Sequence, residues 1–222
     1  ARRNKYLMGE AVRRSGHRAV KQRVVREWDD EAARFVDALD VTVVKPLESA
    51  GSDDVFKCRS SHEAKKAGKS IVGKINGLGN MNDGALIQEF LKGDEYVVDS
   101  VSRDGVQKVV SVWKYDKRPA NGANFVYHGM TTVPAEPKLI EYSKRVCEAL
   151  GIKNGPSHME LMVHGDDVCL VEVGARCHGG EGSWSTIAKA CWACDQIDAT
   201  LYAYLDEAKF AALSDTPQSL GK

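Results

Sequence analysis

The segment that most constrains this chain is H-M-E-L-M-V-H-G-D-D-V-C-L-V-E-V-G-A-R, residues 158–176, because it places acids inside two otherwise apolar runs. The pattern predicts two short strands joined by a tight Gly-Asp turn and followed by a loop that contains glycine. Glu160 and Glu172 stand among Met, Leu and Val, and His158 and Arg176 flank them. A purely structural hairpin gives no reason for two carboxylates at such positions, so the segment predicts a functional site as well as a fold.

The length of the turn decides whether the two glutamates meet. Side chains alternate along a strand, so one face of the second strand is predicted to carry Val168, Leu170 and Glu172. A two-residue connection would pair Glu160 with Val171 and send the acids to opposite faces. A three-residue connection, residues 165–167, pairs Glu160 directly with Glu172 and is a common hairpin loop. We therefore predict an odd-length turn.

Two carboxylates placed directly opposite each other repel, so the predicted register requires a cation between them. Hard oxygen ligands suit Mg²⁺, with Mn²⁺ as an alternative ion. The competing interpretation is that one acid is an edge residue in contact with water. Glu160 and Glu172 are therefore candidate metal ligands.

Charge and composition exclude several classes of protein. The chain has 222 residues with 31 basic and 31 acidic side chains, so no net charge favours nucleic acid or an anionic membrane. Hydrophobic residues make up 43% and charged residues 28%, which is ordinary for a soluble enzyme or binding protein. No apolar run is long enough to span a membrane, and no signal-peptide pattern is present. We expect a cytoplasmic protein that binds neither nucleic acid nor membrane.

The cysteines and the first residue add two expectations. Six scattered cysteines fit a reducing compartment better than a disulfide framework. C-W-A-C at 191–194 is a CxxC motif, but no second pair accompanies it, so we interpret it as part of a buried helix rather than a zinc or redox site. The chain starts at Ala1 and enters a helical pattern at once, which is typical of a piece of a longer protein.

The first ninety residues predict a small α+β unit with a flexible loop. Lys45 ends a buried strand, and the small residues Ser49, Gly51 and Ser52 follow it. Amides and hydroxyls of such a loop donate hydrogen bonds to phosphates, while the lysine supplies positive charge. The alternative is an ordinary hairpin with a mobile tip. The loop is not a Walker motif, because GxxxxGK[ST] is absent.

Two further stretches carry candidate binding groups. A-L-I-Q-E-F-L, residues 85–91, predicts a strand and linker whose backbone suits an adenine edge, and Glu95 at the start of the next strand suits a ribose. W-K-Y-D-K-R, residues 113–118, ends a predicted strand and gathers three cations, Lys114, Lys117 and Arg118. They bind a phosphate or a substrate carboxylate, or they are simply solvated.

The order of elements predicts the α+β class, with mostly antiparallel sheets in two lobes. We assign residues 1–18 to a leading helix of the large lobe and residues 19–88 to a small lobe with the phosphate loop. Residues 89–205 form a large lobe with the metal-binding strands, and residues 206–222 form a short helix and a polar tail. Further expected elements are a strand at 125–131 and helices at 136–150, 184–193 and 195–203.

Five motifs in this order resemble the ATP-grasp superfamily. They are similar to its first-lysine helix, its second-lysine strand and phosphate flap, its adenine hinge with a ribose acid, and its two magnesium strands. In this chain they read R-N-K-Y-L-M (3–8), V-V-K-P-L-E-S-A-G-S (43–52), L-I-Q-E-F-L-K-G-D-E-Y (86–96), H-M-E-L-M (158–162) and L-V-E-V-G-A-R (170–176). The resemblance covers roughly residues 2–205 and implies an ATP-grasp fold in which two α+β lobes grip ATP.

The resemblance also implies roles for individual residues. Lys5 and Lys45 would bind the ATP phosphates, and Glu160 and Glu172 would hold Mg²⁺ that bridges them. The flap over the phosphates would consist of Ser49, Gly51 and Ser52. The adenine and ribose would be held by Gln88, Glu89, Phe90, Leu91 and Glu95. The residues expected to act in catalysis are Arg176, Lys45 and His158.

The chemistry that the resemblance implies is phosphorylation of a carboxylate by ATP, followed by attack of an amine on the acyl phosphate. Fixed cations that neutralise the phosphoryl oxygens suit this reaction, and it needs no protein nucleophile. H-M-E, E-V-G-A-R-C-H-G-G and W-K-Y-D-K-R look closest to the amino-acid and peptide ligase branch, which includes carnosine synthases and D-alanine ligases. The substrate-side candidates are then His158, Lys114, Lys117, Arg118 and His178.

Two departures from the family pattern keep alternatives open. Gly174 stands where the family often has an Asn that binds the second magnesium, and the domain that usually precedes the first lysine is missing from the sequence. The alternatives are an ATP-grasp carboxylase or nucleotide-biosynthesis enzyme, or a nucleotide-binding module without full activity. The expected partners are a small carboxylate, a small amine, and either a second copy of the chain or a neighbouring domain.

Overall fold

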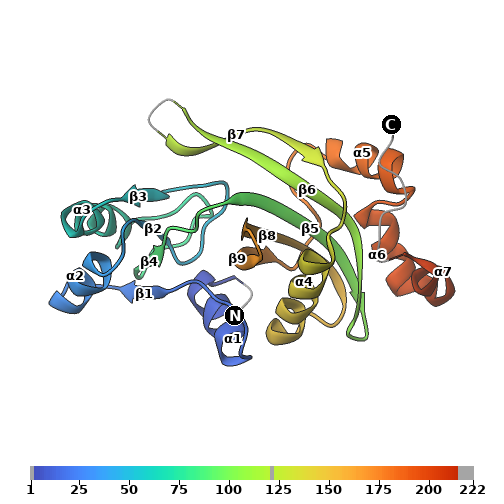
Figure 1. The fold of residues 1–222 in the computed structure, drawn as a ribbon, viewed down its shortest axis with the longest axis horizontal. Coiled ribbons are helices and arrows are strands. Elements are labelled where there is room, and N and C mark those ends of the chain that lie inside the picture. Colours follow the sequence, from blue (N-terminus) through green and yellow to red (C-terminus); the bar gives the residue numbers. More distant parts are fainter. Residues whose placement is uncertain (1–2, 121–122, 215–222) are drawn as a thin grey trace.

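The computed structural model describes residues 3–120 and 123–214, which form two antiparallel sheets with helices packed against them (Figure 1). The smaller sheet has the strand order β1-β4-β2-β3, and the larger sheet has the order β7-β6-β5-β8-β9. This arrangement confirms the predicted α+β class. The last part of the predicted polar tail, residues 215–222, lies outside the described residues.

The strands follow the chain in two groups. The smaller sheet contains β1 (Gln22–Val25), β2 (Thr42–Pro46), β3 (Phe56–Cys58) and β4 (Ala85–Glu89). The larger sheet contains β5 (Asp94–Arg103), β6 (Val106–Ala120), β7 (Ala123–Thr132), β8 (Gly155–His164) and β9 (Asp167–Gly174). The helices are α1 (Lys5–Arg14), α2 (Asp30–Asp37), α3 (Ser61–Ile71), α4 (Pro137–Leu150), α5 (Ser183–Trp192), α6 (Gln196–Leu205) and α7 (Glu207–Ala212).

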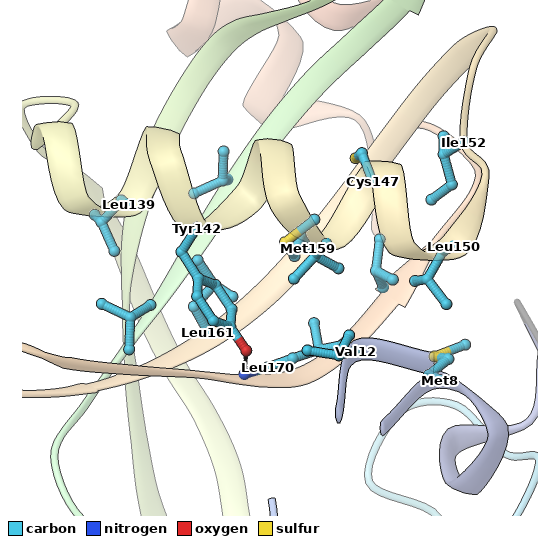
Figure 2. Packing of buried hydrophobic residues seen from close by; sticks show 14 of the residues in the cluster. Met8, Val12, Leu139, Tyr142, Cys147, Leu150, Ile152, Met159, Leu161 and Leu170 are labelled. Atoms are coloured by element: carbon cyan, nitrogen blue, oxygen red, sulfur yellow. Dashed lines mark hydrogen bonds between the residues drawn. The ribbon is translucent and has the colours of Figure 1, made fainter. Parts of the chain in front are cut away.

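The main core lies between one face of the larger sheet and the helices α1 and α4 (Figure 2). Asn4 caps α1 by accepting a hydrogen bond from the Leu7 amide at 3.1 Å. The Tyr142 hydroxyl of α4 accepts a hydrogen bond from the Leu170 amide of β9 at 3.0 Å, which fixes α4 on the sheet. The side chains that α1 contributes to this core are Met8, Ala11 and Val12.

A separate core supports the smaller sheet, where α3 packs against β2 and β4 while α2 packs against α3 and β1. Its fully buried members include Ala32, Val44 and Ile71. Part of the opposite face of the larger sheet is covered by α5, α6 and α7, with Trp113 and Trp184 buried between strand and helix. Each sheet therefore has its own apolar support, and the functional groups are carried on the sides that face each other.

The junction between the two sheets depends on Gly93, in the short link between β4 and β5. Its φ of +128° is unfavourable for any residue with a side chain, and an added Cβ would lie 2.0 Å from the Val163 carbonyl oxygen. The link therefore passes directly against β8, and only glycine fits there.

The β8–β9 hairpin places both glutamates on one face by a route that differs from the predicted one. His164 pairs with Asp167, so the turn has two residues, and the predicted three-residue turn is wrong. A β-bulge at Val171 then shifts the register by one residue, so Glu160 pairs with Glu172 after all. The predicted common face of Leu170 and Glu172 is also wrong, because the bulge separates them.

Other predicted elements need smaller corrections. W-K-Y-D-K-R does not end a strand, because β6 continues to Ala120. The helix α3 ends at Ile71, where Val72 turns to an extended conformation. Within the described parts of the chain, no helix combines the length and the apolar character that crossing a bilayer demands.

Candidate active site

A cleft between the two sheets collects most of the predicted site residues. It holds about 810 Å³ of empty space, counting its open mouth, which is in the size range of small-molecule sites. The predicted nucleotide and metal residues that line it are Lys5, Lys45, Ser49, Gly51, Ser52, Gln88, Glu89, Phe90, Leu91, Glu95, Glu160 and Glu172. Residues 130 or more positions apart in the sequence therefore face one space.

Two buried lysines supply positive charge to this cleft. Lys5 begins α1, and its Nζ donates to the Ser49 carbonyl at 2.6 Å and lies 3.2 Å from Glu172 Oε2. Lys45 ends β2 and is 7% exposed. Burial, followed by repulsion from Lys5, lowers the pKa of Lys45 to about 8. Lys45 is poised for an anionic ligand, because no carboxylate pairs with it among the described contacts, whereas Lys5 already pairs with Glu172.

The predicted phosphate flap, Ser49 to Ser52, lies within the segment 48–54 (called the flap below), which the loop between α3 and β4 supports by hydrogen bonds. Asn76 Nδ2 donates to the Glu48 carbonyl at 2.6 Å, and the Gly77 amide donates to Asp53 Oδ2 at 2.7 Å. Ser52 and Asp54 adopt positive φ values of 61° and 51°. The flap is therefore a shaped segment with its own support rather than an ordinary hairpin tip.

The base of the cleft carries the acids Glu95, Glu160 and Glu172 and one further cation, Lys117. Lys117 Nζ lies 2.5 Å from Glu95 Oε1 and 3.5 Å from Glu160 Oε2, and all three side chains are only 11–12% exposed. The rings of Tyr127 and Tyr115 flank the Lys117 ammonium at 4.3 Å and 5.0 Å. Lys117, predicted on the substrate side, thus lies in the cleft itself between the predicted ribose acid and a predicted metal ligand.

The pKa values of the two acids beside Lys117 shift in opposite directions. Desolvation and the negative charge of Glu160 raise the pKa of Glu95 to about 7, although Lys117 opposes them. Desolvation also acts to raise the pKa of Glu160, but hydrogen bonding to His158 and the charge of Lys117 outweigh it and hold that pKa below its usual range. Glu160 therefore stays ionised, as a metal ligand requires.

The donor set fits a hard divalent cation. Glu160 and Glu172 are directly paired across β8 and β9, both line the cleft, and each lies near a lysine that offsets its charge. Carboxylate oxygens next to an open, water-accessible space are the ligands that Mg²⁺ takes together with phosphate. These two residues are the ones that would hold it.

Arg176 lies outside the cleft lining, at an exposed position after β9. Its Nη1 donates to the neighbouring Cys177 carbonyl at 2.8 Å. A Cβ added to Gly174 would lie 3.2 Å from Arg176 Cγ and 3.3 Å from Nε, so the arginine stem fills the space that a side chain there would need. The Gly174 departure and the placement of Arg176 are therefore linked.

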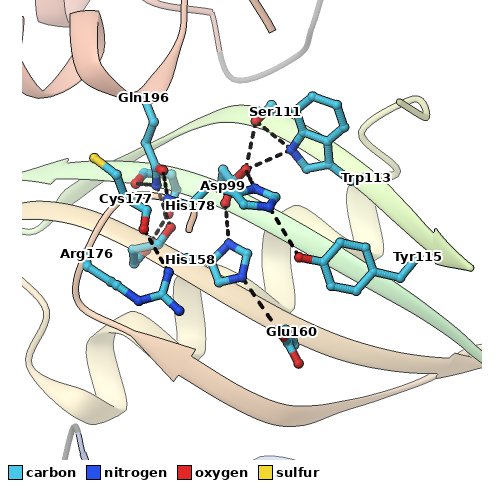
Figure 3. A network of polar contacts seen from close by, with 12 residues as sticks. Asp99, Ser111, Trp113, Tyr115, His158, Glu160, Arg176, Cys177, His178 and Gln196 are labelled. Atoms are coloured by element: carbon cyan, nitrogen blue, oxygen red, sulfur yellow. Dashed lines mark hydrogen bonds and ion pairs between the residues drawn. The ribbon is translucent and has the colours of Figure 1, made fainter. Parts of the chain in front are cut away.

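Next to the cleft, the buried Asp99, which the sequence did not single out as a site residue, accepts hydrogen bonds from both candidate histidines (Figure 3). Asp99 has no exposed surface, and its oxygens accept hydrogen bonds from His158 Nδ1 and His178 Nδ1, both at 2.8 Å. Trp113 Nε1 and Ser111 Oγ donate to the same carboxylate at 2.7 Å and 3.1 Å. An isolated acid among valines in β5 was the available signal, because a buried carboxylate needs partners.

These hydrogen bonds fix the charge of the network. Desolvation alone would raise the pKa of Asp99, but the bonds from His158 and His178 hold it well below its usual range. Desolvation would lower the pKa of His158, but its bonds to Asp99 and Glu160 raise it to about 9. Ligand atoms of the three side chains lie within 4.8 Å of one another. Because both Nδ1 atoms already donate to Asp99, we interpret the group as a hydrogen-bond network and not as a metal site.

The remaining substrate candidates are not brought to this network. Lys114 Nζ pairs with Asp94 at 2.8 Å, and Arg118 pairs with Asp116 through two hydrogen bonds of 2.6 and 2.8 Å. Both cations line a second, open depression that shares Phe90, Leu91 and Glu95 with the cleft. Apolar and aromatic lining residues that the sequence did not single out are Val43, Val55, Phe125, Tyr127, Met162 and Val171.

Comparison with known proteins gives one family and several relatives. Residues 40–185 match the model of the ATP-grasp domain. Dapdiamide A synthase of Enterobacter agglomerans is 34% identical over 219 residues, covering 95% of this chain and 50% of that protein. The L-arginine-specific L-amino acid ligase of Bacillus subtilis is 26% identical over 144 residues, covering 62% of this chain and 34% of that protein. The chain thus spans half or less of the length of these curated relatives.

Solved structures show the same fold at low identity. The L-amino acid ligase of Bacillus licheniformis superposes with a TM-score of 0.68 at 20% identity, covering 96% of this chain and 50% of that chain. Biotin carboxylase of Campylobacter jejuni superposes with a TM-score of 0.71 at 12% identity, covering 100% of this chain and 47% of that chain. The fold is therefore shared by enzymes with different substrates, and fold alone does not choose among them.

Proposed function

The chain belongs to the ATP-grasp family, and on that premise we propose that it is the ATP-binding catalytic part of a carboxylate–amine ligase. The observation that carries the proposal is the pairing of Glu160 with Glu172 opposite Lys5 and Lys45 in one cleft. Carboxylates for a divalent cation and lysines for phosphates meet there, as phosphoryl transfer requires. Curated relatives named dapdiamide A synthase and L-arginine-specific L-amino acid ligase support this branch over carboxylases, which share the fold at low identity.

We assign the roles as follows. Lys5 and Lys45 bind phosphate oxygens, and the flap at 48–54 donates amide and hydroxyl hydrogen bonds to them. Residues 88–91 contact the adenine, and Glu95 holds the ribose. Glu160 and Glu172 hold Mg²⁺, which would supply neutralisation of phosphate charge when bound.

The remaining machinery serves the carboxylate to be activated. An acid oxygen attacks the γ-phosphoryl group, ADP leaves, and the resulting acyl phosphate is attacked by an amine with release of phosphate. Arg176 stands near the end of β9 and is proposed to stabilise charge on the transferring group. The lobes predicted at residues 19–88 and 89–205 are proposed to close on the nucleotide, and their separate cores support this division.

Calorimetric titration with Mg²⁺-ADP tests the nucleotide site. We expect binding by the intact chain and at least about tenfold weaker binding by Glu172→Ala, because even outer-shell partners of a metal contribute 10–100-fold. The matched control is Glu141→Ala, which removes an exposed acid on α4. Absence of binding by the intact chain would show that the proposed site is wrong.

Product analysis tests the ligase chemistry. The full-length chain is incubated with Mg²⁺-ATP and a panel of L-amino acids, singly and in pairs, and ADP and dipeptide are measured. We expect ADP release that depends on the acid and a peptide product that depends on the amine. If the chain binds nucleotide but releases no ADP with any pair of amino acids, it is a nucleotide-binding module and the ligase proposal is wrong.

A further inference from the structure

His178 is held in one tautomer by the buried Asp99. The Nδ1–H of its imidazole donates to Asp99 Oδ2, so Nε2 is the atom left to accept a proton. That nitrogen lies 3.3 Å from the hydroxyl of Tyr115 in β6. Carboxylate, imidazole and phenol therefore form a continuous chain of hydrogen bonds, in which the phenol donates to the imidazole (Figure 3).

The phenol end of this chain lies next to the acids of the proposed active site. The Tyr115 ring is 5.0 Å from the Lys117 ammonium, which bonds to Glu95 and Glu160. It also stands edge-on to Tyr127 at 5.0 Å, and the Tyr127 hydroxyl donates to Glu160 at 3.4 Å. Tyr115 therefore links the interior carboxylate to the region where the acyl phosphate would form.

The proposed ligation needs a proton acceptor at such a place. An amine with an ordinary pKa is an ammonium ion at neutral pH, and it has no lone pair with which to attack. Resting on the proposed function, we propose that Tyr115, His178 and Asp99 form the proton-accepting chain that deprotonates the attacking ammonium group. Tyr115 is the residue that would touch the substrate, and Asp99 is a positioning residue.

The step balances as follows. The ammonium gives one proton to the Tyr115 oxygen while the Tyr115 hydroxyl proton moves to His178 Nε2, and Asp99 stabilises the resulting imidazolium. The amine lone pair then forms the C–N bond as the C–O bond to phosphate breaks. Phosphate leaves with that electron pair and takes the second nitrogen proton, and His178 releases the first proton to solvent. Burial raises the pKa of Tyr115, so the phenol accepts a proton from the ammonium only as its own proton moves to His178.

The groups packed around His178 favour this direction of transfer. Its described neighbours are Asp99 of β5, Tyr115 and Trp113 of β6, His158 of β8, Trp184 of α5 and Gln196 of α6, with Arg176 and Cys177 beside it in the chain. Asp99 is the one carboxylate among them and stabilises a protonated His178. His158, with its ring centroid at 4.3 Å, opposes a lasting positive charge and favours release of the proton.

Hydroxylamine separates proton transfer from activation of the acid. It is largely uncharged at neutral pH, so it traps an acyl phosphate as a hydroxamate without an enzymic base. We expect His178→Gln and Tyr115→Phe to keep hydroxamate formation with Mg²⁺-ATP and the amino-acid panel within about twofold. The same variants should lose about 100-fold or more of amide formation with amino-acid amines, as expected for loss of a general base.

Several outcomes distinguish this proposal from its alternatives. The residual amide synthesis of the variants should rise with pH in step with the free amine, whereas the intact chain should show a flatter profile. His62→Gln on α3 and Tyr204→Phe on α6 are the matched controls, since both are exposed and remote. Equal loss of hydroxamate and amide would overturn the proton-transfer role. A wild-type chain that forms neither product would overturn the proposed function itself.

Discussion

At the scale of single residues, Lys117 stands where a metal ion would compete with it. Its ammonium lies against Glu95 and Glu160, so it neutralises acids that a nucleotide complex would use. Lys117→Met should therefore strengthen binding of Mn²⁺ alone by at least about tenfold. A charge pair at ~4 Å is worth about 4 kcal/mol at an effective dielectric constant of 20, and a third of that energy corresponds to a tenfold change in the dissociation constant. Titration by electron paramagnetic resonance measures this without any turnover.

The control for this experiment is Lys189→Met, which removes an exposed lysine that pairs with Asp195 and Asp198 on the far side of the sheet. Its Mn²⁺ affinity should match that of the intact chain. Unchanged or weaker Mn²⁺ binding in Lys117→Met would contradict a competing role of the ammonium.

Lys45 predicts a pH dependence of nucleotide binding. Its pKa is lowered to about 8 by burial and by Lys5, so the ammonium is present below that pH and is lost as the pH rises through it. Affinity for ADP should therefore fall by about tenfold at one pH unit above this pKa. Calorimetry across this range measures it, and Lys45→Arg should flatten the profile because arginine stays charged. A flat profile for the intact chain would contradict a phosphate contact through Lys45.

At the scale of elements, the loop between α3 and β4 shapes the phosphate flap. Asn76 is 6% exposed, donates to the Glu48 carbonyl, and accepts from the Leu78 and Asn80 amides through Oδ1. Asn76→Ala leaves these backbone groups without their partner, at a cost of about 1–3 kcal/mol in the free energy of unfolding. We expect faster hydrogen exchange of the flap amides at 48–54 and weaker ADP binding.

A comparison with Asn80→Ala checks that result, because Asn80 is an exposed residue of the same loop. Its flap amides should exchange at the wild-type rate. Exchange that is equally fast in both variants would mean that loop composition matters and the Asn76 bond does not.

Element by element, the sequence predicts most of this fold and part of the site. Caps such as Asn4 and the apolar runs of the strands are local signals, and they predict helix starts and strand positions well. The cause of the bulge at Val171 is not local to the hairpin. The bulge is required because Leu170 and Val173 both face α4 while Glu172 faces the cleft. The sequence carries one sign of this bulge: the core residues of β9 are spaced two and then three positions apart.

The network at Asp99 shows the same limit of sequence reasoning. Asp99 lies on β5 and its donors come from β6, β8 and the loop after β9, so only the sheet order brings them together. Sequence alone offered a carboxylate inside an apolar strand and two histidines with no stated partner. The cations Lys114 and Arg118, which are close to Lys117 in the sequence, end on the surface, since alternation along β6 separates them from it.

At the scale of the whole molecule, one arginine ties the two sheets together beside the hinge. Arg18 Nη1 lies 2.9 Å from Glu89 Oε1 of β4, and its Nε lies 3.2 Å from Asp167 Oδ1 of β9. The Tyr142 hydroxyl also donates to the Arg18 carbonyl at 2.6 Å. Because Glu89 belongs to the smaller sheet and Asp167 to the larger, this clamp limits how far the sheets separate.

Arg18→Met should remove both ion pairs of this clamp without creating a cavity in either apolar core. Each of its ion pairs is partly exposed, so we expect a loss of only about 1 kcal/mol in the free energy of unfolding. The larger expected effect is loss of coupling: the smaller sheet should unfold in urea before the larger one. Fluorine NMR of fluorotryptophan reports this, because Trp28 packs in the smaller core while Trp113 and Trp184 pack in the larger sheet.

Mg²⁺-ADP should restore a single transition in Arg18→Met, because its proposed contacts span both sheets and binding to the native state alone stabilises the whole chain. The matched control is Arg23→Met, whose side chain has similar exposure but pairs with Asp29 and Glu31 inside the smaller lobe. That variant should keep coincident transitions. Separate transitions in the intact chain would show that the sheets are independent without nucleotide, and the clamp would then have no role in coupling them.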